Sequence, residues 1–191
     1  MLFGHPLGPS IGAPAKARVH ITAALDLTCP FSKRALQTLK ALADKYPTSQ
    51  VQISKLDWVQ VWHPQAYVMA LAAVAVLRAK DLNAWYKYTD ALFDRQAEFF
   101  DDKVHDLSRS ALEQRLAELA QDIAGVDKAT FAANMKDDRS VRMIKDHTRF
   151  GRQNGVHESP TFMVNGLINR NLSSSTTVDQ WDDVLKPLLA D

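Results

Sequence analysis

The residue best suited to nucleophilic chemistry is Cys29, the single cysteine of the 191-residue chain, at the start of Cys29-Pro30-Phe31-Ser32. A cysteine thiolate attacks disulfide sulfur atoms, and the product of the attack is a mixed disulfide. Because the chain has no second cysteine, it can form neither an internal disulfide nor a cysteine-rich zinc site. Any mixed disulfide on Cys29 must therefore be released by a thiol from outside the chain.

The pattern around Cys29 places it where a strand passes into a helix. Apolar and polar residues alternate over residues 19–25, which predicts a strand. Pro30 fits the first helical turn, because its missing N–H would have no partner there anyway, and an apolar stripe over residues 31–43 predicts the helix. The amides of that turn favour negative charge on the sulfur, and Ser32 can donate its hydroxyl hydrogen to a thiolate. We interpret Cys29 as a reactive thiol that must be reachable from solvent; the alternative is an inert buried cysteine.

Two further segments follow the predicted helix. Residues 51–56 form a second predicted strand, which we expect to be parallel to the first because a helix joins them. Between residues 64 and 153, helix signals occur without a good strand pattern, which indicates a helical insertion. Capping signals are expected at Ser110/Glu113, Gly125, Asp127 and Thr177/Gln180.

The end of the chain predicts a hairpin and a helix. Residues 161–164 are rich in strand formers, Asn165-Gly166 is a strong two-residue hairpin signal, and residues 167–170 can form the returning strand. A last apolar stripe predicts a closing helix. Pro187 is expected to kink or end that helix.

Two segments at joints of this element order carry a resemblance to a known family. They are residues 26–32, Asp-Leu-Thr-Cys-Pro-Phe-Ser, and residues 155–166, Gly-Val-His-Glu-Ser-Pro-Thr-Phe-Met-Val-Asn-Gly. With the order of elements, they make the chain resemble the thioredoxin-fold superfamily, in particular its DsbA-like branch with a helical insertion. The resemblance implies an α/β fold in which residues 1–62 and 154–191 form a thioredoxin-like domain and residues 63–153 an inserted helical subdomain.

The resemblance also implies a site. Pro160 resembles the cis-proline that faces the catalytic cysteine in this superfamily, and the backbone of Ser159 is then placed to pair with an extended peptide or glutathione. Ser32 stands where dithiol members have their second cysteine, either as the natural residue of a monothiol branch or as an engineered Cys→Ser change. His63 begins the insertion and could hydrogen-bond a bound thiol or carboxylate, or simply start a helix. The candidate catalytic residues are Cys29, Ser32 and Pro160, the candidate substrate-binding residues are Pro30, Phe31, His63, Ser159 and Thr161, and no metal ligand is expected.

These residues suggest a monothiol oxidoreductase. We expect Cys29 to reduce glutathione mixed disulfides or protein mixed disulfides, with free glutathione as co-substrate and no tightly bound cofactor. The resemblance leaves a second enzyme class open, kappa-type glutathione transferases and hydroxychromene-carboxylate isomerases, which use a serine at the helix start where this chain has Cys29. A third hypothesis is a non-catalytic binding or redox-sensing protein.

The composition disfavours several classes of protein. With 46% apolar and 24% charged residues, the chain has a globular rather than a disordered composition. A formal net charge of +1 argues against nucleic acid as a partner. The longest apolar run, residues 66–77, is too short to span a bilayer and predicts a buried helix. The stretch before residue 19 reads as an extended surface arm without a signal peptide's apolar core, so with a single thiol we expect a cytoplasmic protein.

Overall fold

The computed structural model describes residues 10–11 and 17–190, and these divide into two compact units. Of the described residues, the first unit takes in those up to Leu25, Cys29–Trp58, and those from Phe150 onward. The second combines Asp26–Thr28 with Val59–Arg149. We expected boundaries after residues 62 and 153; the compact units change after Trp58 and Arg149, and residues 26–28 belong to the second unit.

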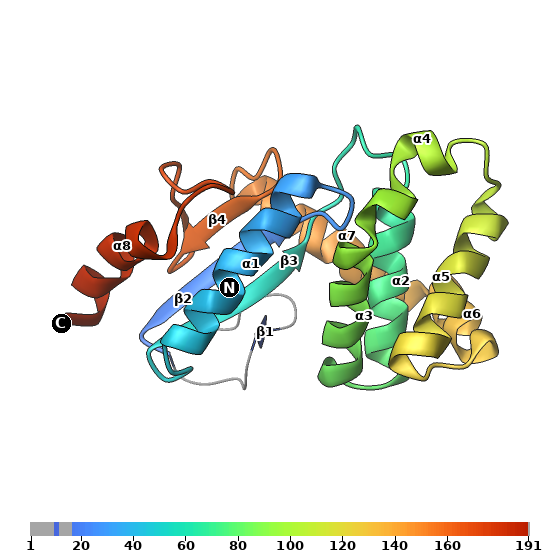
Figure 1. Cartoon of the computed structure of the whole chain (residues 1–191), viewed down its shortest axis with the longest axis horizontal. Helices are drawn as coiled ribbons and strands as arrows, with labels where there is room; N and C mark the ends of the chain where they lie inside the picture. The colour runs from blue at the N-terminus through green and yellow to red at the C-terminus, as the bar shows by residue number, and fades with distance from the viewer. Residues whose placement is uncertain (1–9, 12–16, 191) are drawn as a thin grey trace. The chain divides into compact units, whose positions relative to one another are not determined.

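The first unit contains a five-stranded mixed sheet (Figure 1). Its strands are β1 (Ser10–Ile11), β2 (Val19–Leu25), β3 (Val51–Asp57), β4 (Thr161–Val164) and β5 (Leu167–Ile168), in the spatial order β1-β3-β2-β4-β5. The β2–β3 pair is parallel and the other pairs are antiparallel. This arrangement confirms the predicted α/β fold. The pairing of β1 with β3 was not predicted, and the rest of the expected surface arm, apart from residues 17 and 18, lies outside the described residues.

Helices on this sheet bury its apolar residues. The helix α1 (Pro30–Lys45) packs against β3, and α8 (Val178–Ala190) packs against α1 and β2. The rings of Phe162 and Trp181 meet edge to face with centroids 5.2 Å apart. A separate core cluster consists of Ala24, Leu56, Trp58, Val156 and Met163, with Phe150 and Ile168 packed against it.

Local signals in the C-terminal part were mostly correct. Asn165 and Gly166 have φ angles of 50° and 84°, as a two-residue hairpin turn with two left-handed positions requires. The Thr177 amide donates to Gln180 Oε1 and the Gln180 amide donates to Thr177 Oγ1, which confirms the predicted capping box. Pro187 does not end the last helix, since α8 continues to Ala190. Pro187 removes one hydrogen bond to the preceding turn, and packing of the apolar face of α8 can outweigh that cost.

Helices and the loops that join them make up the second unit within its described residues. Its elements are α2 (Ala66–Ala79), α3 (Leu82–Asp94), the 3-10 helix η1 (Gln96–Phe99), α4 (Asp101–Val104), α5 (Arg109–Ala124), α6 (Lys128–Lys136) and most of α7 (Asp138–Gln153). The central helix is α2, which contacts α3, α5 and α6. Every residue from Val68 to Val76 is buried, as predicted for this apolar run. No helix in the described part of the chain is long and apolar enough to cross a membrane.

The helix ends of this unit show which capping signals were used. Gly125 ends α5 in a left-handed conformation, with φ 63°, and the Asp127 side chain accepts a hydrogen bond from the Thr130 amide at the start of α6. Both were predicted. The capping box at Ser110 was wrong, because α5 begins earlier and Ser108 Oγ accepts the hydrogen bond from the Ala111 amide.

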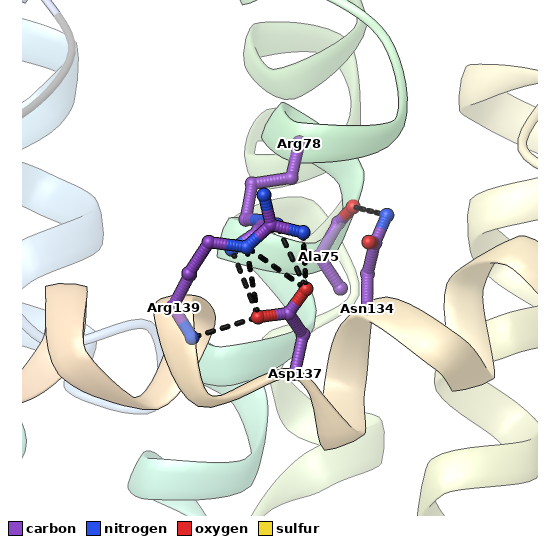
Figure 2. Close-up of polar contacts among 5 residues, drawn as sticks. All are labelled: Ala75, Arg78, Asn134, Asp137 and Arg139. Carbon is purple, nitrogen blue, oxygen red and sulfur yellow. Dashed lines mark hydrogen bonds and ion pairs between the residues drawn. The ribbon is translucent and has the colours of Figure 1, made fainter.

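A carboxylate ties α2 to the junction between α6 and α7 (Figure 2). Asp137 accepts hydrogen bonds from Arg78 Nη2 at 3.0 Å and from Arg139 Nη2 at 2.7 Å, and Asn134 donates to the carbonyl oxygen of Ala75. The hydrogen bonds from Arg139 hold the pKa of the Asp137 carboxyl well below its usual range. These contacts fix the packing of α2 inside the second unit.

Candidate active site around Cys29

Cys29 lies at the expected joint between β2 and α1. It is the N-cap residue of α1, with φ −85° and ψ 118°, and Pro30 occupies the first helical position. Its Sγ atom donates a hydrogen bond to the carbonyl oxygen of Ser159, at 3.3 Å. Only the protonated thiol can donate this bond, so a thiolate at this position must give it up.

The Ser159-Pro160 segment is the other half of the site in the first unit. The peptide bond between Ser159 and Pro160 is cis. The β2–β4 register ends at the pair Ala24↔Thr161, so Ser159 lies beyond the paired part of the strand. Its Oγ atom is buried and has no hydrogen-bond partner among the described residues. The Thr161 hydroxyl donates to the Glu158 carbonyl oxygen at 2.7 Å, which occupies its hydrogen.

The first turn of α1 presents one apolar ring and one buried hydroxyl. Phe31 is 56% exposed, whereas Ser32 is fully buried at the third helical position. The guanidinium of Arg34 lies over the Phe31 ring, 5.6 Å from its centroid, and also donates to Ser174 Oγ. The first turn of α1 carries no acidic residue. A hydrogen bond from Ser32 to the Cys29 sulfur stays a prediction.

Burial is the property of Cys29 that the sequence did not predict. The residue is only 4% exposed, although our interpretation required a sulfur that reagents can reach. Such burial is also what an inert structural cysteine shows. The position at the helix start favours negative charge on the sulfur, whereas the hydrogen bond to Ser159 and the low exposure favour the protonated, shielded thiol.

His63 lies in the second unit and has a partner there. Its Nδ1 atom is 3.1 Å from Oδ2 of Asp26, a residue that is fully buried. Asp26 also accepts hydrogen bonds from the amide and hydroxyl of Thr28 and from the Gln60 amide. Asp26 is not among the candidate site residues predicted from the sequence. A buried carboxylate with several donors has no local sequence signature, because its partners come from segments far apart along the chain.

No metal site accompanies these groups. Within residues 10–11 and 17–190, no three His, Cys, Asp or Glu side chains are arranged to hold a metal ion. The chemistry that the described site itself offers is that of one thiol.

Comparisons with known proteins agree with this architecture. A family model described as Thioredoxin matches residues 6–186. A provisionally assigned protein-disulfide isomerase from Pseudomonas syringae has a similar structure, with a TM-score of 0.79 at 24% identity, covering 92% of this chain and 96% of that one. BdbD from Bacillus subtilis matches with a TM-score of 0.77 at 17% identity, covering 96% and 94%. DsbA from Chlamydia trachomatis matches with a TM-score of 0.69 at 18% identity, covering 95% and 89%. A search of curated protein sequences gave no match.

Proposed function

Because this chain belongs to the thioredoxin family and has the fold of its DsbA-like branch, we propose that it is a thiol-disulfide oxidoreductase that acts through Cys29 alone. The observation that carries the proposal is the contact of Cys29 Sγ, at the start of α1, with the carbonyl oxygen of Ser159 at the cis bond to Pro160. We propose glutathione mixed disulfides as the substrates.

The reaction has two exchange steps. In the first, the Cys29 thiolate attacks the glutathione sulfur of a mixed disulfide, the disulfide bond breaks, and the other thiol leaves and takes up a proton. Cys29 is then bound to glutathione. In the second step, the thiolate of a free glutathione attacks that same glutathione sulfur, which gives oxidised glutathione and regenerates Cys29. The sum converts one mixed disulfide and one reduced glutathione into a free thiol and oxidised glutathione.

The neighbouring residues have separate roles in this proposal. Pro30 and Phe31 border the approach to the sulfur. Ser32 donates a hydrogen bond to the Cys29 thiolate once Cys29 has given up its own hydrogen bond to Ser159. The backbone of Ser159 and Thr161 pairs with the substrate backbone, as the edge of a strand does. That His63, which contacts Asp26 through Nδ1, binds a carboxylate or thiol of the substrate stays a prediction. The proposed cycle needs a compartment that supplies reduced glutathione.

One observation favours a second candidate function. The 4% exposure of Cys29 fits a non-catalytic member of the fold that binds partners or senses oxidants through a slowly reacting thiol. A kappa-type transferase receives less support, because the helix start carries a cysteine and not the serine that activates glutathione in that class.

The two candidates separate in one assay. Purified protein is incubated with the mixed disulfide of glutathione and mercaptoethanol, in the presence of reduced glutathione, and product formation is followed beside Cys29→Ser. We expect turnover by the wild type and none above background by Cys29→Ser. Mass spectrometry after exposure to oxidised glutathione should show one glutathione on Cys29, removed again by reduced glutathione. Equal rates for the two proteins would refute the oxidoreductase, and a reversible adduct without turnover would favour the sensor.

A further inference from the structure

Several side-chain hydrogen bonds hold the turn at residues 26–28, immediately before Cys29. Asp26 Oδ1 accepts from the Thr28 amide at 2.7 Å and from the Thr28 hydroxyl at 2.6 Å. The carbonyl oxygen of Leu27, between them, accepts from Gln96 Nε2 at 2.8 Å. All three residues of the turn are at most 3% exposed. Each residue from 26 to 28 is thus fixed by a hydrogen bond that involves a side chain.

The second oxygen of Asp26 fixes another segment of the same unit. Oδ2 accepts from the Gln60 amide at 2.9 Å and lies 3.1 Å from His63 Nδ1. A fully buried carboxylate is costly unless hydrogen bonds replace its lost water. Here those hydrogen bonds come from residues 28, 60 and 63, so the carboxylate is stable only when these segments take one conformation.

The start of α1 has no side-chain cap, so the turn before it bears on how the chain enters the helix. Cys29 is the N-cap residue, and its side chain makes no capping hydrogen bond to the helix. Serine, threonine, aspartate or asparagine at an N-cap would fix the entry of the chain into the helix through the side chain. Without such a cap, the entry depends more on the residue on the N-terminal side of Cys29, Thr28, to which it is joined by a peptide bond.

We propose that Asp26 is a positioning residue for Cys29: its buried carboxylate fixes the turn at residues 26–28, and that turn sets the backbone from which the nucleophile enters α1. The effect passes along the peptide chain and needs no contact between Asp26 and the sulfur. The predicted effect on the exchange rate rests on the proposed function. The predicted effect on the accessibility of the thiol does not.

Two readouts test the proposal with Asp26→Ala. Releasing the turn should free Cys29 from its buried position, so alkylation by iodoacetamide should become several-fold faster. The same release should lower the exchange rate with the glutathione mixed disulfide by about tenfold or more, since a nucleophile displaced by about 1 Å can lose up to roughly 100-fold. A purely structural role would leave both rates unchanged under conditions where the variant is folded.

Matched variants make the result interpretable. Ser108→Ala also removes a side-chain acceptor from a backbone amide in the second unit, and it should leave both rates within twofold of the wild type. Thr28→Val keeps the Thr28 amide bond to Asp26 but loses the hydroxyl bond, so it should shift both rates in the same directions by less. Thr28→Val also serves if Asp26→Ala does not fold.

The outcomes distinguish this inference from the proposed function. If the wild type shows no exchange, the oxidoreductase proposal fails and alkylation alone decides the role of Asp26. If exchange occurs but both rates of the Asp26 and Thr28 variants match those of Ser108→Ala, the positioning role is refuted and the proposed function stands.

Discussion

Gly151 offers a direct test of packing in the first unit. It lies in α7, next to the core cluster around Trp58. A Cβ atom built on Gly151 would lie 2.6 Å from Cζ3 and 3.0 Å from Cε3 of the Trp58 indole, and 3.5 Å from Leu56 Cδ2. Trp58 is 6% exposed, and its ring is rigid. The ring cannot bend away as the end of a flexible chain would, so the methyl group of Gly151→Ala must displace either the indole or the helix.

The expected cost follows from two opposing effects. Overpacking a well-packed core costs about 1–3 kcal/mol, and a contact as short as 2.6 Å belongs in the upper part of that range. Replacing glycine by alanine inside a helix contributes roughly 0.8–1 kcal/mol of stability in the other direction. We therefore expect Gly151→Ala to lower the free energy of unfolding by about 1–2 kcal/mol, or the melting temperature by roughly 2–8 °C.

Urea unfolding of four proteins measures this effect. They are the wild type, Gly151→Ala, Trp58→Leu and the double variant. Trp58→Leu should itself destabilise the protein by leaving a cavity, but it removes the atoms that the new methyl group would meet. In that background Gly151→Ala should therefore be neutral or stabilising. If alanine stabilises the wild type, or destabilises both backgrounds equally, the packing argument is wrong.

Three further predictions concern single interactions. Hydrogen bonds from Lys45 and Tyr46 hold the pKa of Asp182 well below its usual range, so its stabilisation is present above about pH 4 and is lost as the pH falls further. The urea midpoints of wild type and Asp182→Asn should therefore converge below about pH 4. Burial and Asp182 raise the pKa of Tyr46 to about 12, so the phenolate absorbance missing from Tyr46→Phe should appear near pH 12, not near 10. Ser108→Ala should cost about 1 kcal/mol and Ser110→Ala under roughly 0.5 kcal/mol in urea unfolding, and equal costs would contradict the assigned cap.

The elements that the sequence predicted well are those specified locally. The hairpin at Asn165-Gly166 needs two left-handed residues, and these are the residue types that reach that conformation at low cost. The reciprocal capping box of Thr177 and Gln180 depends on a spacing of three residues within one turn. The joint between β2 and α1 is marked by the change of apolar period on either side of Pro30. Each of these signals is complete within a few residues.

The features that the sequence did not predict depend on distant partners. The strand β1 exists only as a partner of β3, and two residues carry no periodicity. Ser108 and Ser110 both have a side chain that can cap a helix. Which of them caps α5 depends on which apolar residues of the helix become buried. Pro187 is tolerated because α8 has an apolar face to bury. In the sequence, Asp26 has the features of an ordinary loop residue. Its contacts with residues 60 and 63 exist only in the folded chain.

The burial of Cys29 constrains what the proposed enzyme can act on. A thiol that is 4% exposed and donates to the Ser159 carbonyl loses a hydrogen bond when it becomes a nucleophile. The half-buried Ser159 carbonyl then benefits from another donor, since an acceptor shielded from water and without a partner is destabilising. A substrate with an amide N–H next to its disulfide supplies that donor, as glutathione and extended peptides do. The disulfide of mercaptoethanol has no amide. The proposed enzyme should therefore react more slowly with it than with glutathione disulfides.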